Sequence, residues 1–153
     1  MSAGNKSIVE RLFKEGWNKG DPAGFDETVA AEYIQHEHPR ISSVEPGLEG
    51  LKRMVAVYRA AFPDFSITME DLIESNDKVV VRYTLTGTHM GNLNGIRATQ
   101  HKIAATGISI YALDSGKIVE GWTVLDALSL MHLDFGEVSE TLGLIQEFGP
   151  STV

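Results

Sequence analysis

The chain has 153 residues, no cysteine, and a formal net charge of -8 from 13 basic and 21 acidic side chains. This length predicts one domain with a substantial core, and the acidic balance argues against nucleic-acid binding, which needs clustered Lys and Arg. The lack of cysteine excludes disulfides, thiolate nucleophiles and thiolate metal ligands.

The first part of the chain predicts three helices. Ser7 and Glu10 have the spacing of a capping box, and apolar residues follow at helical spacing as far as residue 20. Asp21 and Pro22 are typical of an N-cap and a first helical residue, so a short second helix is predicted over about 23–31. After an extended stretch at 33–38, apolar residues between 48 and 62 step by three and four and predict a third helix, which ends before Pro63.

The second part of the chain changes to a period of two. It predicts four strands, at 65–74, 78–87, 100–113 and 117–126, with turn residues at 75–77 and 114–116 and a longer loop at 88–99. Helical turns are predicted at 127–135 and 138–148. Helices followed by hairpin-connected strands indicate an α+β fold in which an antiparallel sheet curls around a helix and leaves a cavity at one end.

The last predicted strand carries the first catalytic candidate, Asp126. By simple alternation Asp126 shares a face with Trp122 and Val124. If that face is buried, poor solvation raises the pKa of the carboxyl and makes it a useful base near neutral pH. The alternative is that Asp126 is only the N-cap of the following helical turn.

Histidines supply the other polar candidates. His36 and His38 alternate along the extended stretch, so they could face one way and bind a metal, although no spacing supplies a third ligand; His36 could instead hydrogen-bond a ligand in a pocket. His89 follows the predicted strand at 78–87 and opens the loop, where it could donate a proton or polarise a carbonyl, or remain an exposed loop residue.

Other function classes lack their motifs. The sequence has neither GxGxxG nor GxxxxGK[ST], so a dinucleotide or nucleoside-triphosphate enzyme has no support, and it has no GxSxG nucleophile elbow. No apolar run approaches the roughly 18 residues of a membrane helix, and residues 1–7 lack a signal pattern. We therefore expect a cytoplasmic protein with no membrane or nucleic-acid partner.

Three segments together resemble the SnoaL-like polyketide cyclase family, within the nuclear transport factor 2-like superfamily. They are YIQHEHP, GLEGLKRMVAVYRAAFPDFSITMEDLIESNDKVVVRYTLTGTHMG and GKIVEGWTVLDALSLM, in the family's order and spacing. The resemblance implies one domain over 1–153, with a core at about 7–136 and a tail at 137–153. It also implies a cone-shaped, curved antiparallel sheet around N-terminal helices, an apolar pocket, and a homodimer or higher homo-oligomer.

The resemblance also implies a chemistry. In the family's cyclases an acid at the end of the last strand acts as general acid/base for an aldol ring closure, without metal or organic cofactor, and its position matches Asp126. His89 and His36 match the family's pocket histidines and would hydrogen-bond the enolate or the accepting carbonyl. The side chains expected to contact an apolar, oxygen-rich substrate are Trp122, Tyr58, Trp17, His38 and Tyr33.

The expected function is therefore that of a cofactor-free cyclase or isomerase acting on a polyketide or related intermediate. Two alternatives remain open. The same scaffold serves as a non-catalytic ligand-binding or stress-associated domain, and it also carries cofactor-free hydroxylases and dehydratases.

Overall fold

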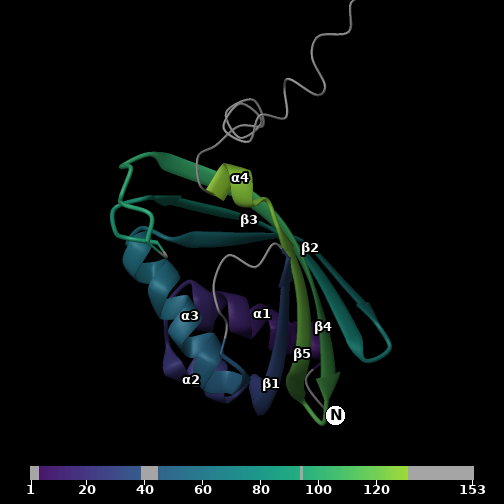
Figure 1. Ribbon diagram of the computed structural model, residues 1–153. Coiled ribbons are helices and arrows are strands. Elements are labelled where there is room, and N and C mark those ends of the chain that lie inside the picture. The colour runs from purple at the N-terminus through teal and green to yellow at the C-terminus, as the bar shows by residue number, and fades with distance from the viewer. Residues whose placement is uncertain (1–3, 39–44, 94, 131–153) are drawn as a thin grey trace, which may run out of the picture.

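Helical segments open the chain and lie against one side of a curved sheet (Figure 1). The computed structural model describes residues 4–38, 45–93 and 95–130. Helix α1 spans Asn5–Arg11 and passes directly into a π-helix, η1, at Leu12–Trp17; α2 spans Pro22–Asp26 and α3 spans Gly47–Ala61. The predicted third helix is confirmed almost to the residue.

The starts of the first two helices differ in how they are capped. The predicted Ser7 capping box is wrong, because the N-cap of α1 is Gly4 and Ser7 already lies inside the helix. The Ser7 amide donates to the Gly4 carbonyl at 2.9 Å. The prediction for α2 is confirmed at its start, where the Asp21 side chain accepts from the Ala23 amide at 3.0 Å. Helix α2 is shorter than predicted, because the chain is already extended from Val29.

Five strands form one sheet in the order β1-β5-β4-β3-β2. Their bounds are Val29–His38 for β1, Ser66–Ser75 for β2, Lys78–Thr88 for β3, Lys102–Asp114 for β4 and Lys117–Leu125 for β5. Strands β2 to β5 pair antiparallel, as predicted, whereas β1 pairs parallel to β5. The long-range pairing of β1 matters for the site, because it fixes which of its side chains face inward.

The core lies between the inner face of the sheet and the helices. Strand β4 shows the arrangement most simply, since buried and exposed residues alternate along its whole length. The largest fully buried side chains come from η1, β1 and the end of α3: Phe13, Tyr33 and Phe62. Burying one such aromatic ring contributes about 1.5–3 kcal/mol, so the contact between helices and sheet holds the fold together.

Strand β5 departs from simple alternation at Val119. Ala112 of β4 pairs with Glu120, but the next residue, Leu113, pairs with Ile118, so Val119 is an extra residue in β5. Such a bulge reverses the alternation of side chains beyond it. Ile118 is buried, and after the bulge the buried residues are Gly121, Thr123 and Leu125, while Trp122 and Val124 belong to the other face.

The chain ends its described part in a short helix, α4, at Ala127–Leu130. The remainder of the predicted helical turns, up to residue 148, lies outside the described residues. Within 4–38, 45–93 and 95–130, no helix has the length and hydropathy needed to cross a membrane.

Candidate functional site

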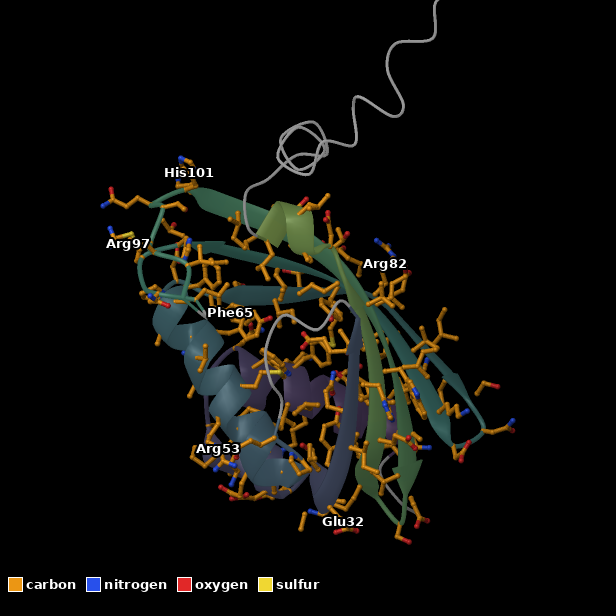
Figure 2. The ribbon with its side chains drawn as sticks, viewed as in Figure 1. Glu32, Arg53, Phe65, Arg82, Arg97 and His101 are labelled. Carbon is orange, nitrogen blue, oxygen red and sulfur yellow. The ribbon has the colours of Figure 1, made fainter. Side chains whose placement is uncertain are left out.

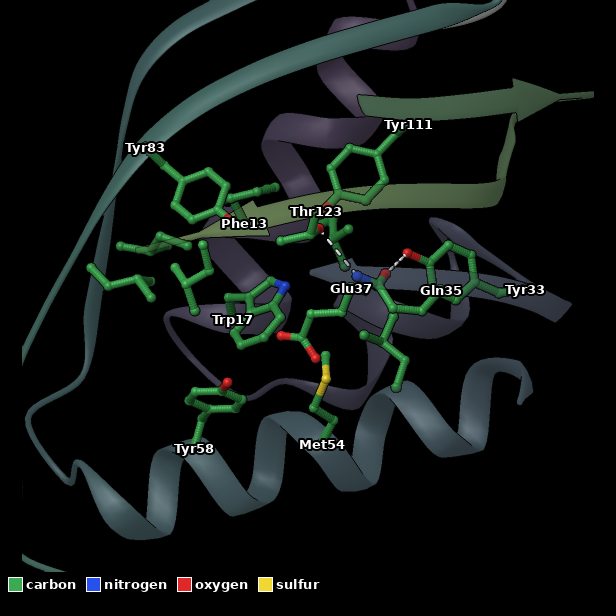
Figure 3. A pocket seen from close by; sticks show the side chains of 15 residues that line it. Phe13, Trp17, Tyr33, Gln35, Glu37, Met54, Tyr58, Tyr83, Tyr111 and Thr123 are labelled. Atoms are coloured by element: carbon green, nitrogen blue, oxygen red, sulfur yellow. Dashed lines mark hydrogen bonds between the residues drawn. The ribbon is translucent and has the colours of Figure 1, made fainter. Parts of the chain in front are cut away.

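A pocket lies between η1, α3 and the inner face of the sheet (Figure 3). Its walls are mainly aromatic and aliphatic, with a few polar groups that come from β1 and β5. The lining residues are Leu12, Phe13, Trp17, Tyr33, Gln35, Glu37, Leu51, Met54, Tyr58, Ile67, Tyr83, Leu85, Tyr111, Thr123 and Leu125. An apolar cavity with a few convergent polar groups is the usual form of a small-molecule site.

The space inside this pocket is small. Its cavity volume is about 40 Å³, and a cavity needs roughly 10–15 Å³ to hold one ordered water. A guest the size of an aromatic ring must therefore displace lining side chains. Met54 suits this role, because it projects from α3 into the pocket (Figure 3) and an unbranched thioether adapts its shape easily.

Glu37 brings a carboxyl group into the pocket. It follows from alternation along β1: Tyr33, Gln35 and Glu37 line the pocket, while Ile34, between them, is exposed on the other face. Figure 3 shows the Glu37 carboxylate directed between Trp17 and Met54. Among the lining residues Glu37 is the one carboxylic acid, and a carboxylate is a group that can accept and return a proton.

A chain of hydrogen bonds fixes the polar wall beside Glu37. The Tyr33 hydroxyl donates to Gln35 Oε1, and Gln35 Nε2 donates to Thr123 Oγ1 at 3.1 Å. The Thr123 hydroxyl lies 2.7 Å from Ser109 Oγ, which in turn lies 3.2 Å from the Tyr83 hydroxyl. Because each partner in such a buried network restrains the next, these side chains form a rigid surface next to the carboxylate.

The pocket's tyrosines are held in the protonated form. Burial raises the pKa of Tyr58, and the nearby Glu37 carboxylate adds to the rise. Burial likewise raises the pKa of Tyr33, with neighbouring tyrosines and Glu37 adding to it, and the pKa of Tyr83, which Ser109 partly counteracts. At neutral pH these hydroxyls therefore act as hydrogen-bond donors rather than as bases.

Trp17 and Tyr58 form the wall opposite the sheet. Their rings meet edge to face with centroids 6.1 Å apart, and Trp17 also stacks on Phe65 at 5.8 Å. With Tyr33, these are three of the five side chains expected to contact a substrate. All three line the pocket, and their contact with a substrate stays a prediction.

Helix α2 lies close against the backbone of the π-helix η1. A Cβ added at Gly24 would lie 2.6 Å from the Gly16 amide nitrogen, so only glycine lets the two backbones come this close. Segments of π-helix often occur at functional sites, and this one places Phe13 and Trp17 in the pocket wall.

Asp126 does not line this pocket. Its side chain is exposed, and its carboxylate accepts hydrogen bonds from the Ser129 amide at 3.2 Å and the Ser129 hydroxyl at 2.6 Å. This is N-cap geometry for α4, so the capping alternative is confirmed and the expectation of a poorly solvated carboxyl is wrong. The cause is the bulge at Val119, which turns the even-numbered residues after it away from the core. A catalytic role for Asp126 remains a prediction.

His36 and Trp122 also lie outside the pocket, on the outer face of the sheet. Their rings stack with centroids 5.5 Å apart, His36 Nε2 lies 2.9 Å from Glu120 Oε1, and the Lys78 ammonium lies 5.6 Å from the centre of the Trp122 ring. Neither side chain lines the pocket, so a contact of either with a substrate stays a prediction. The two rings meet because His36 and Trp122 pair across β1 and β5, and Trp122 faces outward because of the bulge at Val119.

His89 is buried in the protein but away from the pocket. It is 4% exposed, its ring packs against Phe62 at 5.3 Å, and its Nδ1 accepts from the Thr99 amide at 3.4 Å. Backbone hydrogen bonds join His89 to Gln100 and His101 across the base of the loop, and Figure 2 shows His101 and Arg97 at that end of the molecule. His89 thus anchors a loop and does not line the pocket, so its expected role toward a ligand stays a prediction.

The remaining prediction concerns His38. It is the last residue of β1, and its side chain lies outside the described part of the structure. In the described residues no group of three or more His, Asp or Glu side chains is arranged to hold a metal ion.

Sequence reasoning missed Glu37, Gln35 and the hydroxyl network. The sequence YIQHEHP does carry the strand alternation, because Tyr33, Gln35 and Glu37 occupy alternate positions and so share one face. His36 and His38 belong to the opposite face of the same stretch, and alternation alone does not tell which of the two faces is buried.

Comparison with known proteins shows which family this chain resembles. The model of the SnoaL-like polyketide cyclase family matches residues 7–132. The chain belongs to this family. A comparison with curated proteins finds no match.

Several solved structures share this fold over most of their length. TsrD from Streptomyces laurentii is 27% identical with a TM-score of 0.76, covering 86% of this chain and 96% of TsrD. A candidate SnoaL-like polyketide cyclase from Jannaschia sp. CCS1 is 26% identical with a TM-score of 0.76, over 85% and 90% of the two chains. IdmH from Streptomyces antibioticus, a candidate polyketide cyclase, is 25% identical with a TM-score of 0.74, over 85% and 97%.

Proposed function

We propose that this SnoaL-like protein is a cofactor-free cyclase or isomerase that acts on an oxygen-rich, apolar natural-product intermediate, with Glu37 as the acid/base group. The observation that carries the proposal is the position of the Glu37 carboxylate inside a pocket of aromatic walls. Family membership supports the reaction class, and polyketide cyclisation is named for two of its structural neighbours.

In this mechanism the Glu37 carboxylate takes a proton from a carbon that is flanked by carbonyl groups. The electrons of the C–H bond form an enolate, whose carbon attacks a second carbonyl of the folded substrate and closes the ring. The alkoxide formed there is protonated by the Glu37 acid, so the carboxylate is regenerated. Because such a carbon is already acidic, the protein needs mainly to fold the substrate, position one base and exclude water.

Exchange of α-protons for deuterium tests this role without knowledge of the natural substrate. Ethyl benzoylacetate has an aromatic ring and an acidic methylene between two carbonyls, and NMR in D₂O follows its exchange. We expect the wild-type protein to accelerate exchange over buffer, also after dialysis against EDTA. Glu37→Gln is expected to lower the protein-catalysed rate about 10²-fold or more.

Asp126→Asn is the matched comparison, since it makes the same change at the exposed carboxylate. We expect Asp126→Asn to keep the wild-type exchange rate. Loss of exchange in Asp126→Asn, with exchange retained in Glu37→Gln, would return the role of base to Asp126. Saturable binding of the ester by the wild-type protein without any acceleration would favour the non-catalytic binding domain.

A further inference from the structure

Tyr58 presents a buried hydroxyl that no other residue in the described part of the chain engages. The residue is 3% exposed, and its Oη is buried without a hydrogen-bond partner among the residues the structure describes. The hydroxyl points from α3 into the pocket, toward Trp17 (Figure 3). Buried polar groups in folded proteins nearly always have partners, so an exception of this kind needs a reason.

The other pocket tyrosines with assigned partners show the contrast. Tyr33 donates to Gln35, and Tyr83 is hydrogen-bonded to Ser109. Those two hydroxyls belong to the rigid wall of the sheet, whereas Tyr58 stands on the opposite side of the cavity. Among the described residues, the Tyr58 hydroxyl is therefore a buried donor of the pocket that is left to a guest molecule.

Glu37 faces the same cavity and complements this donor. The carboxylate is close enough to help raise the pKa of Tyr58, after burial itself, and this keeps the phenol protonated. The pocket thus offers an O–H donor on one side, a proton acceptor on the other, and flat apolar walls at Phe13 and Trp17. A planar aromatic ketone with hydrogens on the carbon next to its carbonyl matches all three features.

We propose that the pocket selects aryl ketones and that Tyr58 donates a hydrogen bond to the ketone oxygen. The proposal rests on the proposed function, because it places the oxygen on which negative charge develops opposite the base Glu37. When Glu37 takes the α-proton, the C–H electrons form a C=C bond and the carbonyl π electrons move to the oxygen. The proton on Tyr58 stays on the phenol and stabilises that charge through the hydrogen bond.

Binding of two molecules of the same shape tests the proposal. Acetophenone carries the ketone, and α-methylstyrene replaces its C=O by C=CH₂. Their dissociation constants for the wild-type protein and Tyr58→Phe are measured by NMR titration. Because α-methylstyrene is the more hydrophobic probe, the quantity compared between proteins is the ratio of the two constants. We expect Tyr58→Phe to shift this ratio against acetophenone by about tenfold, the effect of one lost hydrogen bond.

Val57→Ala is the control, since Val57 precedes Tyr58 on α3 but is 40% exposed and does not line the pocket. We expect it to leave the ratio at the wild-type value. An unchanged ratio in Tyr58→Phe, or a failure of the wild-type protein to bind acetophenone saturably, overturns the proposal. The outcome is separate from the exchange assay: a ratio that depends on Tyr58 beside an inert Glu37→Gln substitution would keep the ketone site and reject the base.

Discussion

Tyr58 is placed at an energetic cost to the free protein. Leaving a buried hydroxyl without a partner costs about 1–3 kcal/mol, whereas removing the group altogether is nearly neutral or stabilising. A side chain kept in spite of such a cost is typical of functional sites, where activity and stability compete. Stability measurements on Tyr58 therefore report on function as well as on packing.

We expect Tyr58→Phe to raise the free energy of unfolding by about 1 kcal/mol, measured by urea denaturation without ligand. Phenylalanine keeps the ring contact with Trp17 and removes only the unpaired oxygen. Tyr83→Phe should instead lower the free energy by about 1 kcal/mol, because its hydroxyl is bonded to Ser109. A destabilised Tyr58→Phe would show that the hydroxyl has a structural partner.

At the scale of residues, the sequence predicted which helical side chains are buried, but not which face of β1 points inward. Tyr58 and Trp17 lie on apolar helical stripes, so their place in the pocket wall followed from spacing. Glu37 could not be separated from His36 in this way, because alternation defines two faces of β1 without saying which is inside. That choice depends on pairing with β5, more than 80 residues away.

At the scale of elements, Asp64 fastens the turn after α3 to the end of β3. Its carboxylate accepts from the Thr88 amide at 2.6 Å and from the Thr88 hydroxyl at 2.8 Å. These bonds, the amide first, lower the pKa of Asp64 below its ordinary value of 3.8. A carboxyl whose pKa is lowered by folding stabilises the fold above its unfolded value and loses that contribution as pH falls through the folded value.

We expect Asp64→Asn to lower the Tm at pH 7, and the difference from wild type to shrink as pH falls below about 4. Asp71→Asn is the control, because Asp71 makes an exposed ion pair with Arg82 and such pairs contribute little. A Tm difference for Asp64→Asn that persists unchanged at pH 2.5–3 would contradict the role assigned to the charge.

The limits of the elements were predictable where the sequence carries turn and stop signals. Pro63 marked the end of α3, and the polar runs at 75–77 and 114–116 marked the two hairpins. The bulge at Val119 gave no such signal, because an extra apolar residue in an apolar strand looks like its neighbours. Every misplaced residue on β5 follows from that one position.

At the scale of the whole molecule, the outer face of the sheet is unusually apolar. Val124, Ile108 and Ile110 are 62%, 48% and 38% exposed and lie together, since Ile108 pairs with Val124 and Ile110 with Trp122. Neighbouring exposed apolar side chains of this kind commonly mark an interface. A second copy of the chain fits the homo-oligomer that the sequence predicts, because a two-fold axis brings one patch against itself.

We expect the wild-type protein to sediment as a dimer or larger oligomer in analytical ultracentrifugation. The double change Ile108→Lys and Val124→Lys should shift it toward monomer, because it would place like charges within the paired face. Met90→Lys is the control, as Met90 is 53% exposed but lies beyond the end of β3. A wild-type monomer, or an oligomer indifferent to the double change, would rule out this face.

The extra residue in β5 also restricts how this chain can vary in length. Substitutions in β5 leave the two halves of the strand out of phase, and deletion of Val119 itself would only remove the bulge, because Ile118 and Glu120 already pair with consecutive residues of β4. Loss of the bulge at constant length, by contrast, would bring Trp122 to the side now occupied by Gly121. Even a single Cβ at Gly121 would collide with the Tyr33 hydroxyl. Elsewhere in β5 the pocket and the outer face can therefore diverge only by exchange of residues at constant length, since an insertion or deletion there would interchange the faces of the residues beyond it.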